Sequence, residues 1–187
     1  GRRLAYVASD GNRQFVVADG KKGAPDNEVD ALSLVFSPDG KHLAYVATVG
    51  EKQCVVVDGK PGPRYDRVGD PYGTLTAPIL YSPDGRLAYR AQRGEQHYVV
   101  IAGKESGPYE EIGYSHPLFS PDGKHVAFAA QKGERWRVVL DGVEGPEYPR
   151  VFGDTLVFSK DGRLAYAASR DDGTSVVVAA GQEGKPY

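Results

Sequence analysis

The residues most able to do chemistry are four histidines, one cysteine and several carboxylates. The histidines are His42, His97, His116 and His125. None of their spacings is of the His-x-His or His-Glu-x-x-His type that places two imidazoles on one metal ion. Because Cys54 is the only cysteine, neither an intrachain disulfide nor a cysteine-based zinc cluster can form. We therefore predict no metal site and no cofactor.

Catalytic patterns are also missing from the sequence. Residues 113–117 contain a serine but lack the final glycine of a Gly-x-Ser-x-Gly nucleophile elbow. Glu110 and Glu111 are adjacent, and successive side chains of a strand point to opposite faces, so these two carboxylates would not act on one atom. Residues 171–173 lack the rest of a calcium-binding loop. We therefore predict that the chain is not an enzyme.

The elements that must position these side chains are repeated along the chain. The segment Phe/Tyr-Ser-Pro-Asp-Gly occurs at residues 36–40, 81–85 and 119–123, and a fourth copy at residues 158–162 has lysine in place of proline. With Gly1 counted as the same position, the glycines recur at intervals of 39, 45, 38 and 39 residues. Periods of this length occur in propeller blades and in some helical repeats.

The pattern within each repeat predicts strands. A Leu-Ala-Tyr-like triplet follows the glycine, and a β-branched run follows a polar loop. The triplets begin at Leu4, Leu43, Leu87, Val126 and Leu164, and the runs begin at Phe15, Val55, Val99, Val138 and Val176. A strand before the turn and a short fourth strand complete an antiparallel sheet. In the second repeat the four strands are expected at residues 34–37, 43–47, 53–58 and 65–68.

We predict an all-β fold, a β-propeller of about five four-stranded antiparallel blades with a period of about 39 residues. Sheets with apolar residues at consecutive positions need cover on both faces, and radial stacking supplies it. The single domain, residues 1–187, divides into units 1–39, 40–84, 85–122, 123–161 and 162–187. The first blade is expected to lack its inner strand and the last its outer strand. Either five blades close into a ring, or they form an arc completed by further sequence or by a second copy.

The Phe-Ser-Pro-Asp-Gly-Lys turn before Leu-Ala-Tyr, and the Val-Val-Asp-Gly hairpin, resemble the TolB-like propeller repeats, relatives of the WD repeats. The resemblance covers essentially the whole chain. Lys160 departs from it in the turn, and Ala102 and Ala180 replace the aspartate of the hairpin. Members of this group serve as scaffolds, sensor domains and gating domains of peptidases, so the resemblance implies the blade and not the function. It favours a bacterial protein in the periplasm or another extracytoplasmic location.

The candidate binding residues lie on the loops expected to share one face of the propeller. This face contains the connections from the fourth strand to the next first strand and from the second strand to the third. The longest connection follows Val68 and contains Asp70 and Tyr72. The other candidates are Arg93, His97, His116, Lys132, Arg135 and Trp136. We predict a protein or peptide partner on this face, and packing between blades is the alternative role for Trp136.

Charge and hydropathy narrow the classes of partner. Lysine and arginine number 23 against 25 aspartate and glutamate, so the formal net charge is −2. This balance predicts neither nucleic-acid binding nor attraction to an anionic membrane, and no apolar stretch approaches the roughly 18 residues that cross a bilayer. The main functional hypothesis is a non-enzymatic binding scaffold. The alternatives are a gating or substrate-selecting domain of a larger enzyme, such as a serine peptidase, and a structural or engineered fragment that self-assembles as a homo-oligomer.

Overall fold

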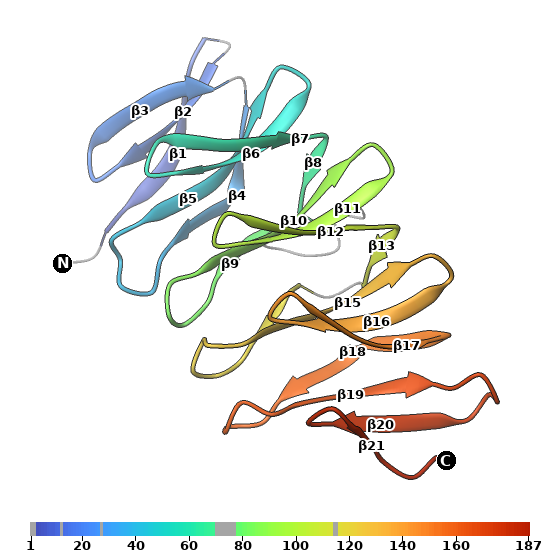
Figure 1. Ribbon diagram of the computed structural model, residues 1–187. Coiled ribbons are helices and arrows are strands. Elements are labelled where there is room, and N and C mark those ends of the chain that lie inside the picture. Colours follow the sequence, from blue (N-terminus) through green and yellow to red (C-terminus); the bar gives the residue numbers. More distant parts are fainter. Residues whose placement is uncertain (1–2, 12, 27, 70–77, 114–115) are drawn as a thin grey trace.

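The computed structural model describes residues 3–11, 13–26, 28–69, 78–113 and 116–187, and every helix or strand assigned in these ranges is a β-strand (Figure 1). The strands form five antiparallel sheets. The sheets follow one another in a row, from the blue first sheet to the red fifth sheet, and the N- and C-termini lie at opposite ends of that row (Figure 1).

Each sheet is built from strands that are close in sequence. The first contains β1 (Ala5–Asp10), β2 (Arg13–Ala18) and β3 (Lys21–Asp26). The second contains β4 (Glu28–Phe36), β5 (Leu43–Val49), β6 (Lys52–Val57) and β7 (Lys60–Tyr65). The third contains β8 (Arg67–Val68), β9 (Ile79–Tyr81), β10 (Leu87–Arg93), β11 (Gln96–Ile101) and β12 (Lys104–Tyr109). The fourth contains β13 (Glu111–Ile112), β14 (Leu118–Phe119), β15 (Val126–Lys132), β16 (Arg135–Leu140) and β17 (Val143–Tyr148). The fifth contains β18 (Arg150–Phe158), β19 (Leu164–Ser169), β20 (Ser175–Ala179) and β21 (Gln182–Glu183).

The serine of the Ser-Pro-Asp-Gly turn holds the first and second strands of a sheet together. In the second sheet the Ser37 hydroxyl donates to Asp39 (2.6 Å) and accepts the N–H of His42 (3.0 Å). The Gly40 N–H donates to the Ser37 carbonyl at 2.8 Å, and Gly40 has φ 69°, which favours glycine. The fourth copy keeps this arrangement, since Ser159 donates to Asp161 at 2.5 Å. Lys160 therefore does not break the turn.

Tyrosines at the outer edge join neighbouring sheets. Tyr65 ends β7, is fully buried and meets the ring of Tyr89 in the third sheet edge-on, with centroids 6.2 Å apart. Its hydroxyl donates to Glu105 at 2.6 Å. The Arg93 guanidinium binds the same carboxylate with two hydrogen bonds, of 2.6 and 2.9 Å. The side chains of the third sheet therefore complete the packing and the hydrogen bonds of the second.

The predicted bounds of the fourth strand are wrong. In the second sheet this strand is Lys60–Tyr65, and the Arg67–Val68 strand pairs with β10 of the third sheet. The sequence places the start of this strand at its first apolar residue. In the structure, pairing with the third strand begins directly after the hairpin that joins the two strands, in a segment rich in glycine and proline. For the same reason the fifth sheet does have an outer strand, Gln182–Glu183, which pairs with β20. In the described residues the first sheet has three strands, and β1 pairs with β2 alone.

Candidate functional site

The connections between strands gather on two sides of the row. The loops between the second and third strands, such as β10–β11, β15–β16 and β19–β20, project on one side, which we call the loop side (Figure 1). The Ser-Pro-Asp-Gly turns and the hairpins between the third and fourth strands lie on the other, the turn side (Figure 1). The sequence predicts binding on the loop side. A cleft is found on the turn side.

This cleft lies between the third and fourth sheets and has a volume of about 720 Å³. One wall comes from β12, the end of β11 and the turn before β10, and the other from β17, the hairpin before it and the start of β15. The lining residues are Arg86, Ile101, Ala102, Lys104, Glu105, Ser106, Gly107, Tyr109, Lys124, Val126, Asp141, Gly142 and Glu144. Smaller clefts of about 220, 550 and 520 Å³ lie at the three other junctions of consecutive sheets.

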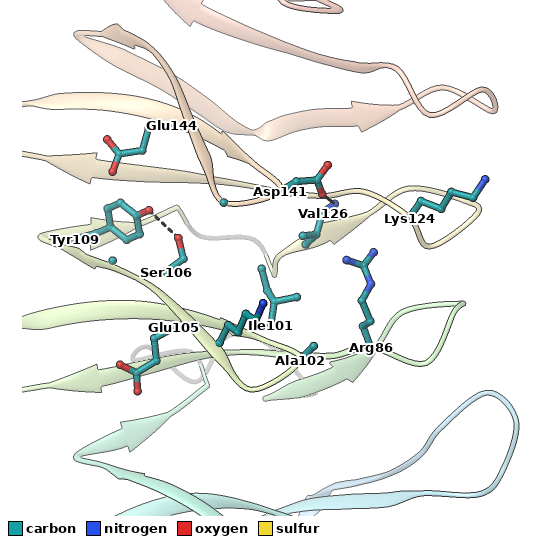
Figure 2. A pocket seen from close by; sticks show the side chains of 13 residues that line it. Arg86, Ile101, Ala102, Glu105, Ser106, Tyr109, Lys124, Val126, Asp141 and Glu144 are labelled. Atoms are coloured by element: carbon teal, nitrogen blue, oxygen red, sulfur yellow. Dashed lines mark hydrogen bonds between the residues drawn. The ribbon is translucent and has the colours of Figure 1, made fainter.

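The two ends of the cleft differ in chemistry. Figure 2 shows Arg86 and Lys124 at one end, with Ile101 and Val126 between the walls. At the other end the Ser106 and Tyr109 hydroxyls are 3.0 Å apart and hydrogen-bonded (Figure 2). The cleft thus combines a cationic end, an apolar middle and a hydroxyl-bearing end.

The carboxylates that line the cleft are already neutralised by partners. Glu105 is held by Arg93 and Tyr65, and these hydrogen bonds lower the pKa of Glu105 below its usual value. Glu144 is 2.7 Å from Arg137 and 3.2 Å from Lys132.

Asp141 accepts hydrogen bonds from the Val126 N–H at 2.9 Å and from His125 at 2.7 Å. Lys104 makes no ion pair with any described residue. Because the acids are paired and Lys104 is not, the lining favours an anionic group.

A local change in the repeat shapes this cleft. The third residue of the fourth strand is glycine in the second and fourth sheets, where an added Cβ would lie only 3.1 and 3.0 Å from a carbonyl oxygen of the neighbouring strand. In the third sheet this residue is Ser106, and the next is Gly107. Gly107 has φ 133° and lies where a Cβ would be 2.9 Å from the His97 carbonyl, so only glycine fits. Proline occupies the position of Gly107 in the second and fourth sheets.

The structure places three of the residues predicted from the loop side in contacts between sheets: Arg93, Arg135 and Trp136. Arg93 binds Glu105, and its guanidinium lies 4.5 Å from the ring centre of Tyr65. His97 lies half-buried in β11, where burial, followed by the charge of Arg90, lowers its pKa. His116 is half-buried before β14. Arg93 therefore supports the stacking of the second and third sheets, and the two histidines are partly buried.

The candidates in the fourth sheet have similar positions. Lys132 pairs with Glu144. Arg135 pairs with Asp171 of the next sheet. Trp136 packs against the core shared by the fourth and fifth sheets, as its alternative role predicts. Asp70 and Tyr72 lie outside the described residues. The loop-side site remains a prediction, whereas sequence reasoning missed the cleft, whose signals were Ala102 and the Ser-Gly pair at 106–107.

In the described parts of the chain, no group of three histidine, cysteine, aspartate or glutamate side chains is arranged to hold a metal ion. The same residues include no helix long and apolar enough to cross a membrane.

Neither a protein-family model nor a curated protein matches the chain. Among solved structures, it is similar to TolB from Acinetobacter baumannii, with 16% identity and a TM-score of 0.42 over 95% of this chain and 49% of that one. It is also similar to dihydro-heme d1 dehydrogenase NirN, with 14% identity and a TM-score of 0.46 over 98% of this chain and 46% of that one. For virginiamycin B lyase from Staphylococcus aureus the identity is 15% and the TM-score 0.33, over 94% of this chain and 72% of that one.

These matches agree with the resemblance to TolB-like repeats. The chain spans about half the length of the first two structures, 49% and 46%. The prediction that the chain is not an enzyme is overturned, because a dehydrogenase and a lyase are among the matches. That prediction considered motifs within single segments, whereas a site on a repeated fold can be assembled from loops of several sheets.

Proposed function

We propose that the chain is a propeller-type scaffold of about five blades that binds a protein partner through an extended peptide segment. The segment lies in the cleft between the third and fourth sheets. The observation that carries this proposal is the cleft itself, about 720 Å³, with an apolar middle between two polar ends. A groove with these properties suits a peptide, whose side chains alternate between apolar and polar contacts.

The edges of the two sheets support a peptide ligand. β12 and β17 are the outer strands of their sheets, and both line the cleft. An outer strand offers backbone N–H and C=O groups to an added extended chain. The unpaired charge of Lys104 adds complementarity to an acidic segment.

The loop side is the competing surface for the same function. The predicted residues there include Arg93, Lys132 and Arg135, each of which has an acidic partner within the chain. A ligand would have to replace these ion pairs, at a cost in free energy. In the turn-side cleft Arg86 and Lys124 pair with the aspartates of their own turns, but Lys104 requires no such replacement, and we therefore prefer this cleft.

A blocking experiment tests this placement. Peptides selected from a displayed library on the wild-type protein are synthesised with a fluorophore, and their affinity is measured by anisotropy. Lys104→Cys is then labelled with a bulky maleimide, which does not reach the buried Cys54. We expect binding before labelling and its loss afterwards, because the adduct fills the cleft.

Two labelled variants serve as matched controls. Lys60→Cys carries the adduct at the equivalent position of the second sheet, and Glu134→Cys carries it on the loop side. Both adducts should leave the affinity unchanged. If the adduct at position 134 blocks binding and the adduct at position 104 does not, the partner binds the loop side and the placement is wrong.

A further inference from the structure

The hairpin between the third and fourth strands holds a carboxylate at the same place in three sheets. Its first residue there is an aspartate with positive φ: Asp19, Asp58 or Asp141. The carboxylate accepts the N–H of the first residue after the Ser-Pro-Asp-Gly turn region. These N–H groups belong to Leu4 (3.0 Å), Leu43 (3.0 Å) and Val126 (2.9 Å). The basic side chain just before that residue is the second partner: Arg3 (2.8 Å), His42 (2.6 Å) and His125 (2.7 Å).

The backbone N–H and the basic side chain together form an anion-binding site. The aspartate of the hairpin is the anion that occupies it. At Asp19 the backbone hydrogen bond from Leu4, followed by that from Arg3, lowers the carboxyl pKa. Arg3 also reaches the next sheet, where its guanidinium donates to the Gly40 carbonyl at 2.7 Å. One arginine thus binds a carboxylate and bridges two sheets at the same time.

The third sheet keeps the arginine and the backbone N–H but has no carboxylate in the hairpin, and Arg86 pairs instead with Asp84 of its own turn at 3.1 Å. Arg86 is equivalent to Arg3, and its guanidinium likewise donates to a carbonyl of the next sheet, that of Gly123. Leu87 follows it, as Leu4 follows Arg3. The aspartate position is Ala102, whose methyl group offers no acceptor to either residue.

Ala102 also has an unfavourable backbone conformation. Its φ is 48°, in the left-handed region where alanine is disfavoured and aspartate or asparagine is preferred. Alanine is therefore less suited than aspartate to this backbone conformation. It also cannot make the hydrogen bonds that Asp58 and Asp141 make. Departures of this kind from a repeated, stable solution are expected at functional positions.

We propose that a carboxylate of the bound peptide occupies this vacant position, with the Leu87 N–H, Arg86 and Lys104 as its recognition groups. The inference rests on the proposed function and specifies its ligand. Arg86, Ala102 and Lys104 line the cleft of Figure 2, and Lys124 lies across from them on the fourth sheet. A carboxylate at this end leaves the rest of the peptide to run over the apolar middle toward Ser106.

The fifth sheet provides an internal comparison. Ala180 replaces the aspartate there too, with φ 49°, and Arg163 is equivalent to Arg86. Arg163 pairs with Asp161 at 2.8 Å, as Arg86 does with Asp84 at 3.1 Å, but its side chain is 68% exposed, against 28% for Arg86. Gln182 stands at the position of Lys104, and no further sheet is described beyond this one. Ala180 and Arg163 line the smaller cleft of about 520 Å³ between the fourth and fifth sheets, and neither lines the cleft of Figure 2.

Peptide probes and NMR test the inference. The probes are N-acetyl-Ala-Val-Ala with a free terminal carboxylate, the same peptide as its amide, and N-acetyl-Ala-Asp-Ala amide, which carries only a side-chain carboxylate. Amide chemical shifts of Leu87 and Ala102 are followed during titration. We expect at least one carboxylate peptide to shift both signals and to bind about tenfold more tightly than the uncharged amide, as one charge-assisted hydrogen bond implies. Comparing the two acids identifies the terminal or the side-chain carboxylate as the preferred source.

Two substitutions complete the test. Ala102→Asp places the chain's own carboxylate in the position and should abolish the preference for acids, whereas Ala180→Asp should leave it unchanged. Both variants should fold, because aspartate occupies this hairpin position in three other sheets. If acid and amide bind the cleft equally, the carboxylate inference is wrong while peptide binding stands. If the acids bind Ala102→Asp as well as wild type, or no probe shifts these signals, the inference is also wrong, and the labelling experiment alone decides the proposed function.

Discussion

At the scale of single residues, a few polar side chains determine the geometry of every turn. Asp122 accepts the Ser120 hydroxyl at 2.7 Å and the Lys124 N–H at 3.1 Å. These two hydrogen bonds, that from Ser120 first, lower the pKa of Asp122 to about 2, and Asp39 has the same value for the same reason in the second sheet. The carboxylate form is therefore the one that the folded turn binds.

Ser120→Ala should raise the pKa of Asp122 toward its usual value of 3.8, because the largest cause of the shift is removed. Carbon-detected NMR titration of the carboxyl group measures this, and Asp39, whose serine is intact, is the internal control. A folded pKa below the unfolded value stabilises the protein above pH 3.8, and this contribution is lost as the pH falls through about 2. The variant should thus lose more stability at pH 6 than at pH 2. An unchanged pKa of Asp122 would contradict the role given to Ser120.

At the scale of strands and sheets, the junctions are held by the outer tyrosines. Tyr65 is fully buried and donates to Glu105 of the next sheet, with its ring against Tyr89. Tyr148 repeats the arrangement with Glu183 and Tyr166. The fourth strand therefore connects two sheets, although its sequence is poor in β-formers.

A double-mutant cycle of Tyr65→Phe and Glu105→Gln measures this connection. We expect Tyr65→Phe to lower the free energy of unfolding by about 1 kcal/mol, because it removes one hydrogen bond. Glu105→Gln should lower it by more, because it also removes the ion pair with Arg93, and the coupling between the two changes should be below about 1 kcal/mol, because glutamine can still accept from the tyrosine. Urea denaturation followed by fluorescence gives the values. Tyr109→Phe with Glu105→Gln is the control pair, because the Tyr109 hydroxyl bonds Ser106 in its own strand. An unchanged free energy of unfolding for Tyr65→Phe would show that the hydrogen bond contributes nothing across the junction.

The second and third strands could be predicted from the sequence because their residues carry a strong local signal. Leu43–Val49 and Lys52–Val57 contain the triplet and the β-branched run, and both are strands. The Lys60–Tyr65 strand could not be predicted, because Gly62 and two prolines suppress the local preference and pairing with β6 overrides it. The cleft was missed for a related reason. On the turn side the repeats are nearly alike, and this junction differs by Ala102 and by the Ser106–Gly107 pair, where the second and fourth sheets have Gly-Pro.

At the scale of the whole molecule, the two terminal sheets expose residues that the inner sheets bury. Tyr187 has the position of Tyr65 in the repeat and is 72% exposed. Tyr6 has the position of Tyr89 and is 49% exposed, against 5% for Tyr89. In the inner junctions these two positions contact each other. A second copy of the chain can therefore repeat an inner junction by packing its first sheet on the fifth.

We expect copies of this chain to associate with one another as the protein concentration rises, because exposed apolar faces of this kind favour association. Multi-angle light scattering after size exclusion should give a mass above 20.1 kDa that falls toward the monomer on dilution. Tyr187→Glu should remove the association, and Leu32→Glu, which changes another exposed apolar side chain (80%), should not. A monomer at every concentration would contradict end-to-end packing.

Hydrogen–deuterium exchange of the protein with and without a display-selected peptide tests the central claim most directly. If the peptide lies between the third and fourth sheets, protection should appear in residues 101–109 and 141–144, which line that cleft. The β10–β11 and β15–β16 loops on the loop side should exchange as before. Protection confined to residues 93–97 and 132–136 would contradict the account and place the partner on the opposite side of the molecule.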